Sequence, residues 1–233
     1  MGPGRGSGVI ARTTAVVEAG GVLGELACAP PLTLRQVHGA AGRCELRLVG
    51  TAAGPLPGDH LSLTLRLRPG ARATLRAVAA SLAQGGASSL LMRADLAEGA
   101  DLVADPGALI VCAGSRVDVR LELALGTGAA VDWRELVVLG RSGEPPGLAT
   151  LRWDVTRCGR PVLRQAADVG LAGHRVLASA LISDPAGSAR TVACSATAVA
   201  QRVDRHTFLV SVLDDDAARA GRRLDELCSR ARG

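Results

Sequence analysis

The sequence predicts a mainly β fold of stacked, solenoid-like sheets that ends in a helix. Three observations predict it: several segments alternate strictly between apolar and polar residues, turn-forming residues separate these segments at short intervals, and the apolar residues are mostly small or branched. Among 233 residues only Trp133, Trp153 and Phe208 are aromatic. Leucine, valine and alanine must therefore form the core, and such side chains suit closely stacked sheets. We expect one domain over residues 1–233, with a flexible N-terminus at about 1–8.

Alternation is clearest in three segments. In residues 61–68, leucine occupies every second position, and serine, threonine or arginine occupies the positions between. Residues 116–123 and 151–156 alternate in the same way. Three further segments follow the pattern less strictly: residues 43–49, 72–79 and 207–213. Because neighbouring side chains of a strand point to opposite faces, each segment is predicted to be a half-buried strand.

A short unit recurs between the predicted strands: a turn that contains Gly-Ala, followed by a strand. It occurs at four places, residues 69–71, 98–100, 106–108 and 128–129. Turns and strands in succession are typical of an all-β sandwich or a solenoid-like stack. The spacing is too uneven for a named repeat, so the sequence predicts layered strands and no more.

A helix is predicted at the C-terminal end, over about residues 214–233. Three aspartates, Asp214 to Asp216, precede apolar residues at helical spacing, and arginines follow. Acidic residues at the start and basic residues toward the end match the helix dipole. We expect the aspartates to cap the first turn rather than bind metal, because Ca²⁺ and Mg²⁺ loops need further oxygen ligands at set spacing. Residues 80–92 could hold a second short helix.

The basic residues exclude some function classes. All 27 are arginine, so the chain lacks the lysine that a P-loop nucleotidase places on phosphates and the lysine that a Schiff base needs. The net charge of +5 could suit nucleic acid or an acidic partner. However, the arginines are interleaved with Asp and Glu, and the aromatic platforms of single-strand binders are nearly missing. We therefore expect an acidic protein partner and no nucleic acid.

The cysteines and the lack of targeting signals indicate a cytoplasmic protein. The six cysteines form no C-x-x-C pair and have no regular spacing, which favours packing in the core over a disulfide framework or metal binding. The first residues lack the apolar stretch of a signal peptide. The uncharged stretch 77–92 is 16 residues long and contains polar residues, so no membrane span is expected.

The sequence contains no recognisable catalytic constellation. It has four isolated histidines: His38, His60, His174 and His206. Neither a nucleophile elbow nor a dinucleotide-binding turn occurs. Asp59-His60 is the most suggestive pair for a transition metal, although adjacent residues of a strand point to opposite faces. The sequence therefore predicts a protein that is not an enzyme.

Several short motifs follow one another in a distinctive order. Gly58-Asp59 leads into the strand from Leu61 and then into the turn Pro69-Gly70-Ala71. The motifs further on are Gly99-Ala100-Asp101-Leu102, Asp105-Pro106, Ala113-Gly114-Ser115-Arg116, Glu135 with Gly140-Arg141, Gly143-Glu144, and Gly159-Arg160-Pro161. In this order they resemble the family of the urease accessory protein UreD, also called UreH, over about residues 20–170. Three places depart from the family: Val103-Ala104 replaces an aromatic residue, Ala79-Ala80-Ser81-Leu82 replaces an Ala-Ala-Thr-Lys element, and Cys158 replaces the aspartate of a turn.

The resemblance implies a mainly β fold and a role in nickel insertion into urease. It implies a complex with UreF and the GTPase UreG that docks on apo-urease, with nickel passing through an internal tunnel in UreD. The chain would then be a scaffold and conduit with Ni²⁺ in transit and no tightly bound cofactor. The missing P-loop lysine fits such a complex, in which another subunit hydrolyses the nucleotide.

Within that role, Asp59, Glu135 and Glu144, together with His60, are expected to be weak, transient nickel ligands along a wet passage. Labile oxygen ligands suit transfer, because thiolate or multi-histidine sites would trap Ni²⁺. Two simpler interpretations stay open: Asp59 could belong to the turn before the strand, and Glu135 could pair with an arginine such as Arg141. The chain could also be a β-sheet adaptor that binds a UreF-like partner without contacting metal.

Overall fold

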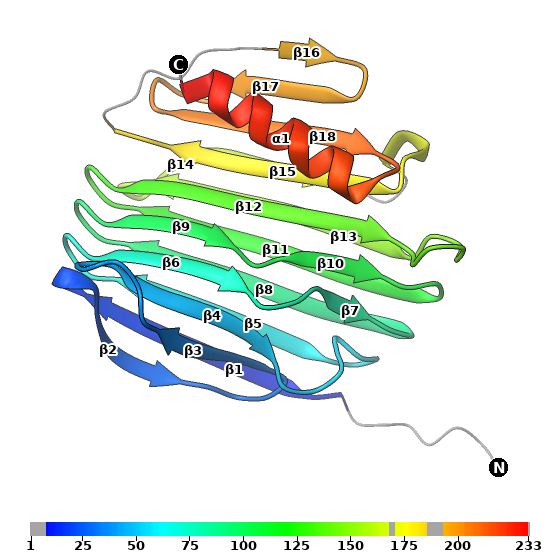
Figure 1. Cartoon of the computed structure of the whole chain (residues 1–233), viewed down its shortest axis with the longest axis horizontal. Coiled ribbons are helices and arrows are strands. Elements are labelled where there is room, and N and C mark those ends of the chain that lie inside the picture. The colour runs from blue at the N-terminus through cyan, green and yellow to red at the C-terminus, as the bar shows by residue number, and fades with distance from the viewer. Residues whose placement is uncertain (1–7, 168–170, 186–192, 233) are drawn as a thin grey trace.

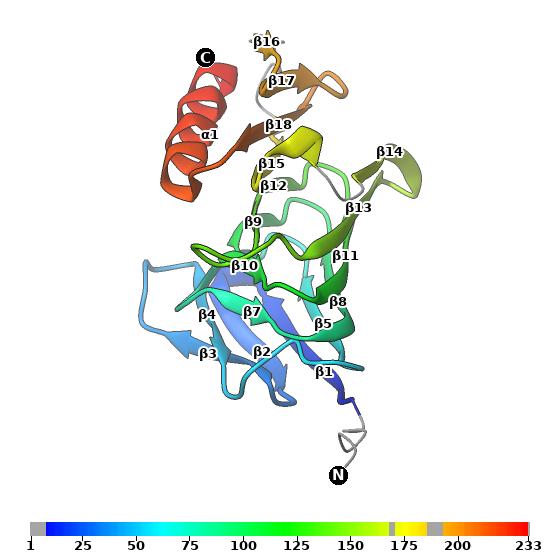
Figure 2. The same ribbon diagram turned by 90° about the vertical axis from the view of Figure 1, so that its right-hand side faces the viewer.

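The strands form two sheets that lie face to face (Figure 1, Figure 2). The computed structural model describes residues 8–167, 171–185 and 193–232. The seven-stranded sheet contains, in spatial order, β14 (Arg160–Ala167), β13 (Leu148–Arg157), β11 (Ser115–Leu125), β8 (Gly86–Leu96), β5 (His60–Leu67), β1 (Ile10–Glu18) and β2 (Val22–Ala27). The main path of the eleven-stranded sheet is β16 (Ala193–Ser195), β17 (Ala198–Arg202), β18 (Thr207–Asp214), β15 (Val176–Ser183), β12 (Ala130–Leu139), β9 (Asp101–Asp105), β6 (Arg72–Ala77), β4 (Cys44–Gly50) and β3 (Leu32–Val37). Beside that path lie two short strands, β7 (Ser81–Ala83) and β10 (Ala108–Val111).

The chain alternates between the two sheets from β4 to β13, so successive passes stack like the coils of a solenoid. Neighbouring strands of these coils are parallel. In the central coils the partners are 29 residues apart: Leu61 pairs with Leu90, and Leu90 pairs with Val119. The predicted fold class is therefore confirmed, and the central coils are more regular than the sequence led us to expect.

Three of the four Gly-Ala units form corners of these coils, and the fourth, at residues 106–108, lies between β9 and β10 of one sheet. Gly70, Gly99 and Gly128 follow one another at the same interval of 29 residues and have φ angles of 69°, 64° and 67°. Glycine adopts this left-handed conformation readily because it has no Cβ. The N–H of Gly70 donates to the carbonyl of Glu98 at 2.8 Å, and the N–H of Gly99 donates to the carbonyl of Thr127 at 2.9 Å. These hydrogen bonds link each corner to the next.

All six predicted strands are present, as β4, β5, β6, β11, β13 and β18. The alternation in β5 has the expected consequence, because Leu61, Leu63, Leu65 and Leu67 are all buried between the two sheets. Each leucine that leaves water in this way stabilises the fold by roughly 1.5–3 kcal/mol relative to an exposed one. Leucine, valine and alanine supply most of the core, and Trp133 and Trp153 also lie in it.

Helix α1 (Ala217–Arg232) covers the outer face of the eleven-stranded sheet at its C-terminal end (Figure 1). Ala220, Leu224 and Leu227 belong to an apolar cluster with residues of β15, β17 and β18. This cluster is separate from the core between the sheets, and it adds a third layer at this end of the molecule (Figure 2).

The start of α1 agrees with the predicted capping. Asp216 Oδ1 accepts the backbone N–H of Arg219 at 2.7 Å. Asp214 accepts the backbone N–H of Asp216 at 2.9 Å and pairs with the Arg219 guanidinium. The aspartates therefore satisfy N–H groups that the first helical turn leaves free.

The possible helix at residues 80–92 was a wrong prediction. These residues form β7 and the first part of β8, because Gly85 and Gly86 make a turn with φ angles of 64° and 48°. After the turn, Leu90 and Met92 are buried at alternate positions, which is the period of a strand. The predicted flexibility at about residues 1–8 falls mainly on residues 1–7, which lie outside the described residues. In the described part of the chain, no helix is both long and apolar enough to span a membrane.

Candidate functional site

Glu135 places a carboxyl group in the space between the two sheets. It lies in β12, where Trp133 and Val137 are buried at the alternate positions on either side, and only 9% of Glu135 is exposed. Trp153, which belongs to β13 in the opposite sheet, donates its Nε1–H to Glu135 Oε2 at 2.7 Å. This hydrogen bond joins the two sheets through the core.

Burial raises the pKa of Glu135 to about 7, because the charged form loses its hydration there. The indoles of Trp153 and Trp133 oppose this change, since their N–H groups stabilise the carboxylate. Of the two indoles, only Trp153 makes a hydrogen bond of normal geometry, because the buried Nε1 of Trp133 has no hydrogen-bond partner within the described residues. A carboxyl with this pKa changes between its neutral and charged forms near neutral pH, and the charged form can bind a cation.

A small cavity adjoins the Glu135 side chain. Its volume of about 30 Å³ is enough for one water-sized group. Leu90 and Met92 of the seven-stranded sheet form one side, and Pro106 and Gly107, which connect β9 to β10, form another. The cavity therefore leaves space beside the carboxyl for a single water molecule.

Asp59 lies in the turn before β5, as the simpler of its two interpretations predicted. Only 4% of the residue is exposed. Its Oδ1 accepts the backbone N–H of Val9 at 2.8 Å, and its Oδ2 accepts the backbone N–H of Leu56 at 2.8 Å. Each carboxylate oxygen therefore holds a loop segment, and a nickel-binding role for Asp59 stays a prediction.

His60 follows Asp59 but lies in a different environment. Its side chain is exposed on β5, and its Nδ1 is 2.7 Å from the hydroxyl of Ser89 on the neighbouring strand β8. Asp59 is buried beside it, so the two side chains are separated as adjacent strand positions predict. The pair does not converge on one point.

Glu144 lies in the connection between β12 and β13 and pairs with Arg141. Arg141 Nε donates to Glu144 Oε1 at 2.8 Å, and these hydrogen bonds lower the pKa of Glu144 to about 2. The suggested pairing of Glu135 with Arg141 was therefore wrong, because Glu135 bonds to Trp153 and Arg141 bonds to Glu144. The Arg141–Glu144 pair is near the surface, so its contribution to stability is small.

The predicted nickel-binding residues therefore occupy separate places. Asp59 and His60 lie at the start of β5, Glu135 lies in the middle of β12, and Glu144 follows β12. Among the described residues, no group of three or more His, Cys, Asp or Glu side chains is arranged to hold a metal ion. Their roles as transient ligands remain predictions.

The glycines of the family motifs lie at turns. Gly58, Gly140, Gly143 and Gly159 have φ angles of 83°, 84°, 78° and 75°, the region that glycine favours. Cys158, which departs from the family, also has a positive φ of 48° before Gly159. These residues therefore shape the connections between the coils, and Pro161 follows in the hairpin from β13 to β14.

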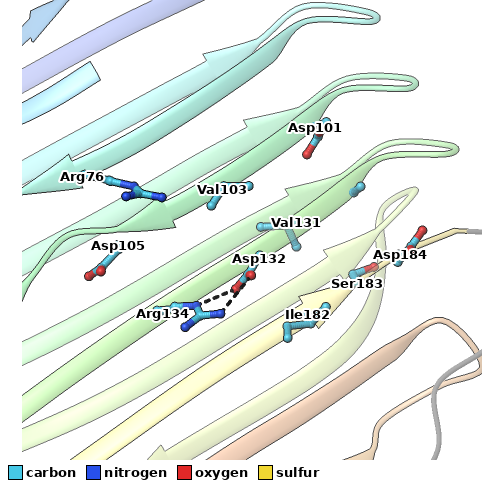
Figure 3. A pocket seen from close by; sticks show the side chains of 11 residues that line it. Arg76, Asp101, Val103, Asp105, Val131, Asp132, Arg134, Ile182, Ser183 and Asp184 are labelled. Carbon is cyan, nitrogen blue, oxygen red and sulfur yellow. Dashed lines mark hydrogen bonds and ion pairs between the residues drawn. The ribbon is translucent and has the colours of Figure 1, made fainter. Parts of the chain in front are cut away.

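A second candidate site is a groove of about 680 Å³ on the outer face of the eleven-stranded sheet (Figure 3). Charged side chains from β6, β9 and β12 line it, together with Val103, Val131 and Ile182. Arg134 pairs with Asp132 inside the groove at 3.2 Å and with Asp225 of α1. The groove was not predicted from the sequence, because its residues meet only when separate coils stack.

Trp153 is the residue of the buried site that sequence reasoning missed. Its alternation with Arg152 and Asp154 predicted an inward side chain correctly. The partner of its N–H could not be predicted, since that depends on how the two sheets face each other. One general signal was available: a buried tryptophan N–H usually finds a hydrogen-bond acceptor.

Comparison with known proteins gives one consistent family. Residues 8–233 match the sequence profile described as UreD urease accessory protein. A protein named urease accessory protein UreD 1, from Saccharopolyspora erythraea, is 37% identical over 72% of this chain and 74% of its own length. Proteins named urease accessory protein UreD, from Parafrankia and Streptomyces coelicolor, are each 32% identical; the first match covers 87% of this chain and 81% of the relative, and the second covers 84% of each.

Proposed function

Because this chain belongs to the UreD family of urease accessory proteins, we propose that it acts in urease maturation as a scaffold and conduit for Ni²⁺. It would work in a complex with a UreF-like protein and a UreG-like GTPase, and the complex would deliver the ion to apo-urease. The nickel is cargo that the chain passes on. The chain itself carries out no chemical reaction in this proposal.

The buried carboxyl of Glu135 is the observation that supports a conduit most directly. A charged group inside a Leu, Val and Ala core is costly unless a partner stabilises it. Glu135 has two indole N–H groups near it and a small cavity beside it. A divalent cation in that cavity would favour the charged carboxylate, just as an opposite charge does in general.

One oxygen ligand suits passage better than a complete metal site does. A carboxylate binds Ni²⁺ weakly and releases it quickly, whereas several imidazoles or thiolates would hold it. Glu135 is therefore proposed as a transit point within the conduit.

The alternative is a β-sheet adaptor that binds its partners and never contacts the metal. Its support is the outer-face groove of Figure 3, which offers an open charged surface to another protein. In this alternative Glu135 is only a structural residue that ties the two sheets together. Both functions require the same maturation complex. They differ in whether this chain contacts the metal, and that difference can be tested.

The Glu135→Gln variant separates the two functions. Glutamine keeps the shape of the side chain and can still accept the Trp153 hydrogen bond, but it has no charge. In cells that depend on this chain, the conduit predicts that urease activity falls while the complex with the accessory proteins still forms. The adaptor predicts unchanged activity and unchanged assembly. Ser179→Ala, at the β15 residue that pairs with Glu135, is the control that alters a neighbouring position without removing a charge.

A further inference from the structure

Three arginines lie side by side on the outer face of the eleven-stranded sheet. Arg35 of β3 lies in register with Arg47 of β4, and Arg47 lies in register with Arg76 of β6. The residue before each of them is a leucine that is buried between the two sheets, so the arginine side chains point outward. These three residues, Arg35, Arg47 and Arg76, form what we call the arginine row.

The positive charge of the arginine row is only partly neutralised. Arg35 and Arg76 are exposed and form no ion pair with any residue that the structure describes. Arg47 pairs with Glu45 of its own strand at 3.5 Å. Asp105 of β9 lies in register with Arg76, but its Oδ1 accepts a backbone N–H at 3.0 Å. Like charges on directly opposite residues destabilise a sheet, so carboxylates from another molecule would relieve this repulsion.

Adjacent arginines on the seven-stranded sheet have more carboxylate partners. Arg120 of β11 lies in register with Arg152 of β13. Arg120 pairs with Glu122 at 3.0 Å and with Asp154 at 3.2 Å. Two carboxylates of the same sheet therefore serve one arginine there, whereas the described residues supply one carboxylate to the three arginines of the row.

A helix of the chain itself neutralises an arginine further along the same face. The register of β6, β9 and β12 puts Arg134 at the level of Arg76, with Asp105 between them (Figure 3). Helix α1 contacts β12, β15, β17 and β18, and its Asp225 pairs with Arg134. The strands β9, β6, β4 and β3 lie beyond this helix (Figure 1, Figure 2). The arginine row therefore occupies the part of the outer face that α1 leaves uncovered.

The spacing of the arginine row matches carboxylates on a helix. Neighbouring strands lie about 4.8 Å apart, so three arginines on adjacent strands span about 10 Å. Helix residues i, i+4 and i+7 share one face and span about 10.5 Å along the axis. Three side chains on one face of an extended segment would span about 13.5 Å, which fits less well. Val37, which is 37% exposed, and Val49 lie beside the row and offer apolar contacts to such a helix.

We propose that the arginine row is a docking surface for a helix of a partner protein that carries carboxylates at positions i, i+4 and i+7. The helix would lie beside α1 and extend the third layer over β6, β4 and β3. Nucleic acid fits this surface less well, because Glu45 and Asp105 would repel phosphates and these strands carry no aromatic residue for base stacking. The inference rests on the proposed function, because it takes the partner from the urease maturation complex.

The test measures the dissociation constant between the full chain and the purified complex of the UreF-like and UreG-like proteins. The double variant Arg35→Glu/Arg76→Glu reverses the two arginines of the row that lack an ion pair. The dissociation constant should rise about tenfold or more, because like charges then face the carboxylates of the partner. If this variant does not fold, as thermal unfolding would show, Arg35→Gln/Arg76→Gln removes the charges without reversing them and should raise the constant about threefold or more.

A matched control changes the net charge equally on the opposite sheet. Arg116 and Arg152 are exposed on the seven-stranded sheet, so Arg116→Glu/Arg152→Glu should leave the dissociation constant unchanged. The photo-reactive residue p-benzoylphenylalanine in place of Val37 identifies the docked segment, because mass spectrometry locates its crosslink on the partner. A crosslink to a helix with carboxylates at i, i+4 and i+7 supports the proposal, and a crosslink to a segment without them overturns it.

The outcomes separate the docking surface from the proposed function. Weaker binding of the row variant alone supports the docking surface. Equal binding of the row variant and the unchanged chain overturns the docking surface and leaves the proposed function standing. Equal weakening of the row variant and the control reflects net charge alone and also overturns the docking surface, as does a DNA duplex that binds the unchanged chain but not the row variant. If the unchanged chain does not bind the accessory proteins, the proposed function fails as well.

Discussion

The indole N–H of Trp153 donates to the carboxylate of Glu135 at 2.7 Å, across the interface between the two sheets. Trp153 comes from the seven-stranded sheet and Glu135 from the eleven-stranded sheet. The core around them consists mainly of Leu, Val and Ala, so this hydrogen bond is a polar contact inside an apolar interior. The predictions on the buried site follow from that pairing.

Replacement of Glu135 by glutamine should change how stability depends on pH. The pKa of Glu135 is about 7 in the folded chain and near 4.5 in the unfolded chain, so the folded state binds the proton more tightly. The free energy of unfolding should therefore fall as pH rises from about 4.5 to about 7, by up to roughly 3 kcal/mol. Glu135→Gln should lack this fall and be the more stable protein at pH 8.

Urea unfolding of both proteins at pH 5 and pH 8 measures the effect. The difference between the two proteins is the informative quantity, because the other titrating groups are common to both. An equal loss of stability in both proteins between these pH values would show that Glu135 does not titrate in this range.

Removal of the indole donor should destabilise the chain most when Glu135 is charged. Trp153→Phe keeps an aromatic ring in the core but leaves the carboxylate without its hydrogen bond. We expect a loss of about 1–3 kcal/mol at pH 8 and a smaller loss at pH 5. In a Glu135→Leu background the cost of Trp153→Phe should no longer depend on pH, and persistence of the dependence would contradict the pairing.

Two glycine substitutions should have opposite effects. Gly99 has a φ of 64° at a corner of the solenoid, and the place that a Cβ would occupy there is open, so Gly99→Ala is strained by its backbone alone. It should destabilise the chain by about 1 kcal/mol. Gly221 lies inside α1 with equally open space, so Gly221→Ala should stabilise by about 0.5–1 kcal/mol. Thermal unfolding of both variants tests the difference, and changes of the same sign would contradict it.

The first turn of α1 should depend on the Asp216 side chain. Asp216→Ala removes the acceptor for the Arg219 N–H and should destabilise the chain by about 1 kcal/mol. Asp216→Ser retains a capping oxygen and should recover most of that loss. Chemical denaturation measures both variants, and equal stability of the alanine and serine variants would show that capping is not the role of this residue.

Alternation in the sequence was sufficient to predict the main strands, and the charge pattern around Asp214 to Asp216 was sufficient to predict the helix. Both signals are local, because they reflect side-chain direction along one element. The regular interval between Gly70, Gly99 and Gly128 was also present in the sequence but was not recognised as a repeat. The uneven segments on either side of these three corners obscured it.

The arrangement of the buried site could not be predicted from local patterns. The contact of Glu135 with Trp153 depends on how the strands of opposite sheets meet, which alternation does not encode. The error over residues 80–92 has a different origin: their Ala and Leu content suits a helix, but Gly85 and Gly86 turn the chain and β8 is held between two parallel neighbours.

The nickel content of urease tests the central claim most directly. Urease would be purified from cells that contain this chain and from cells that lack it, with the other accessory proteins present in both, and nickel per active site would be measured by mass spectrometry. The account predicts nearly empty sites without the chain and filled sites with it. Equal nickel loading in the two preparations would contradict the account.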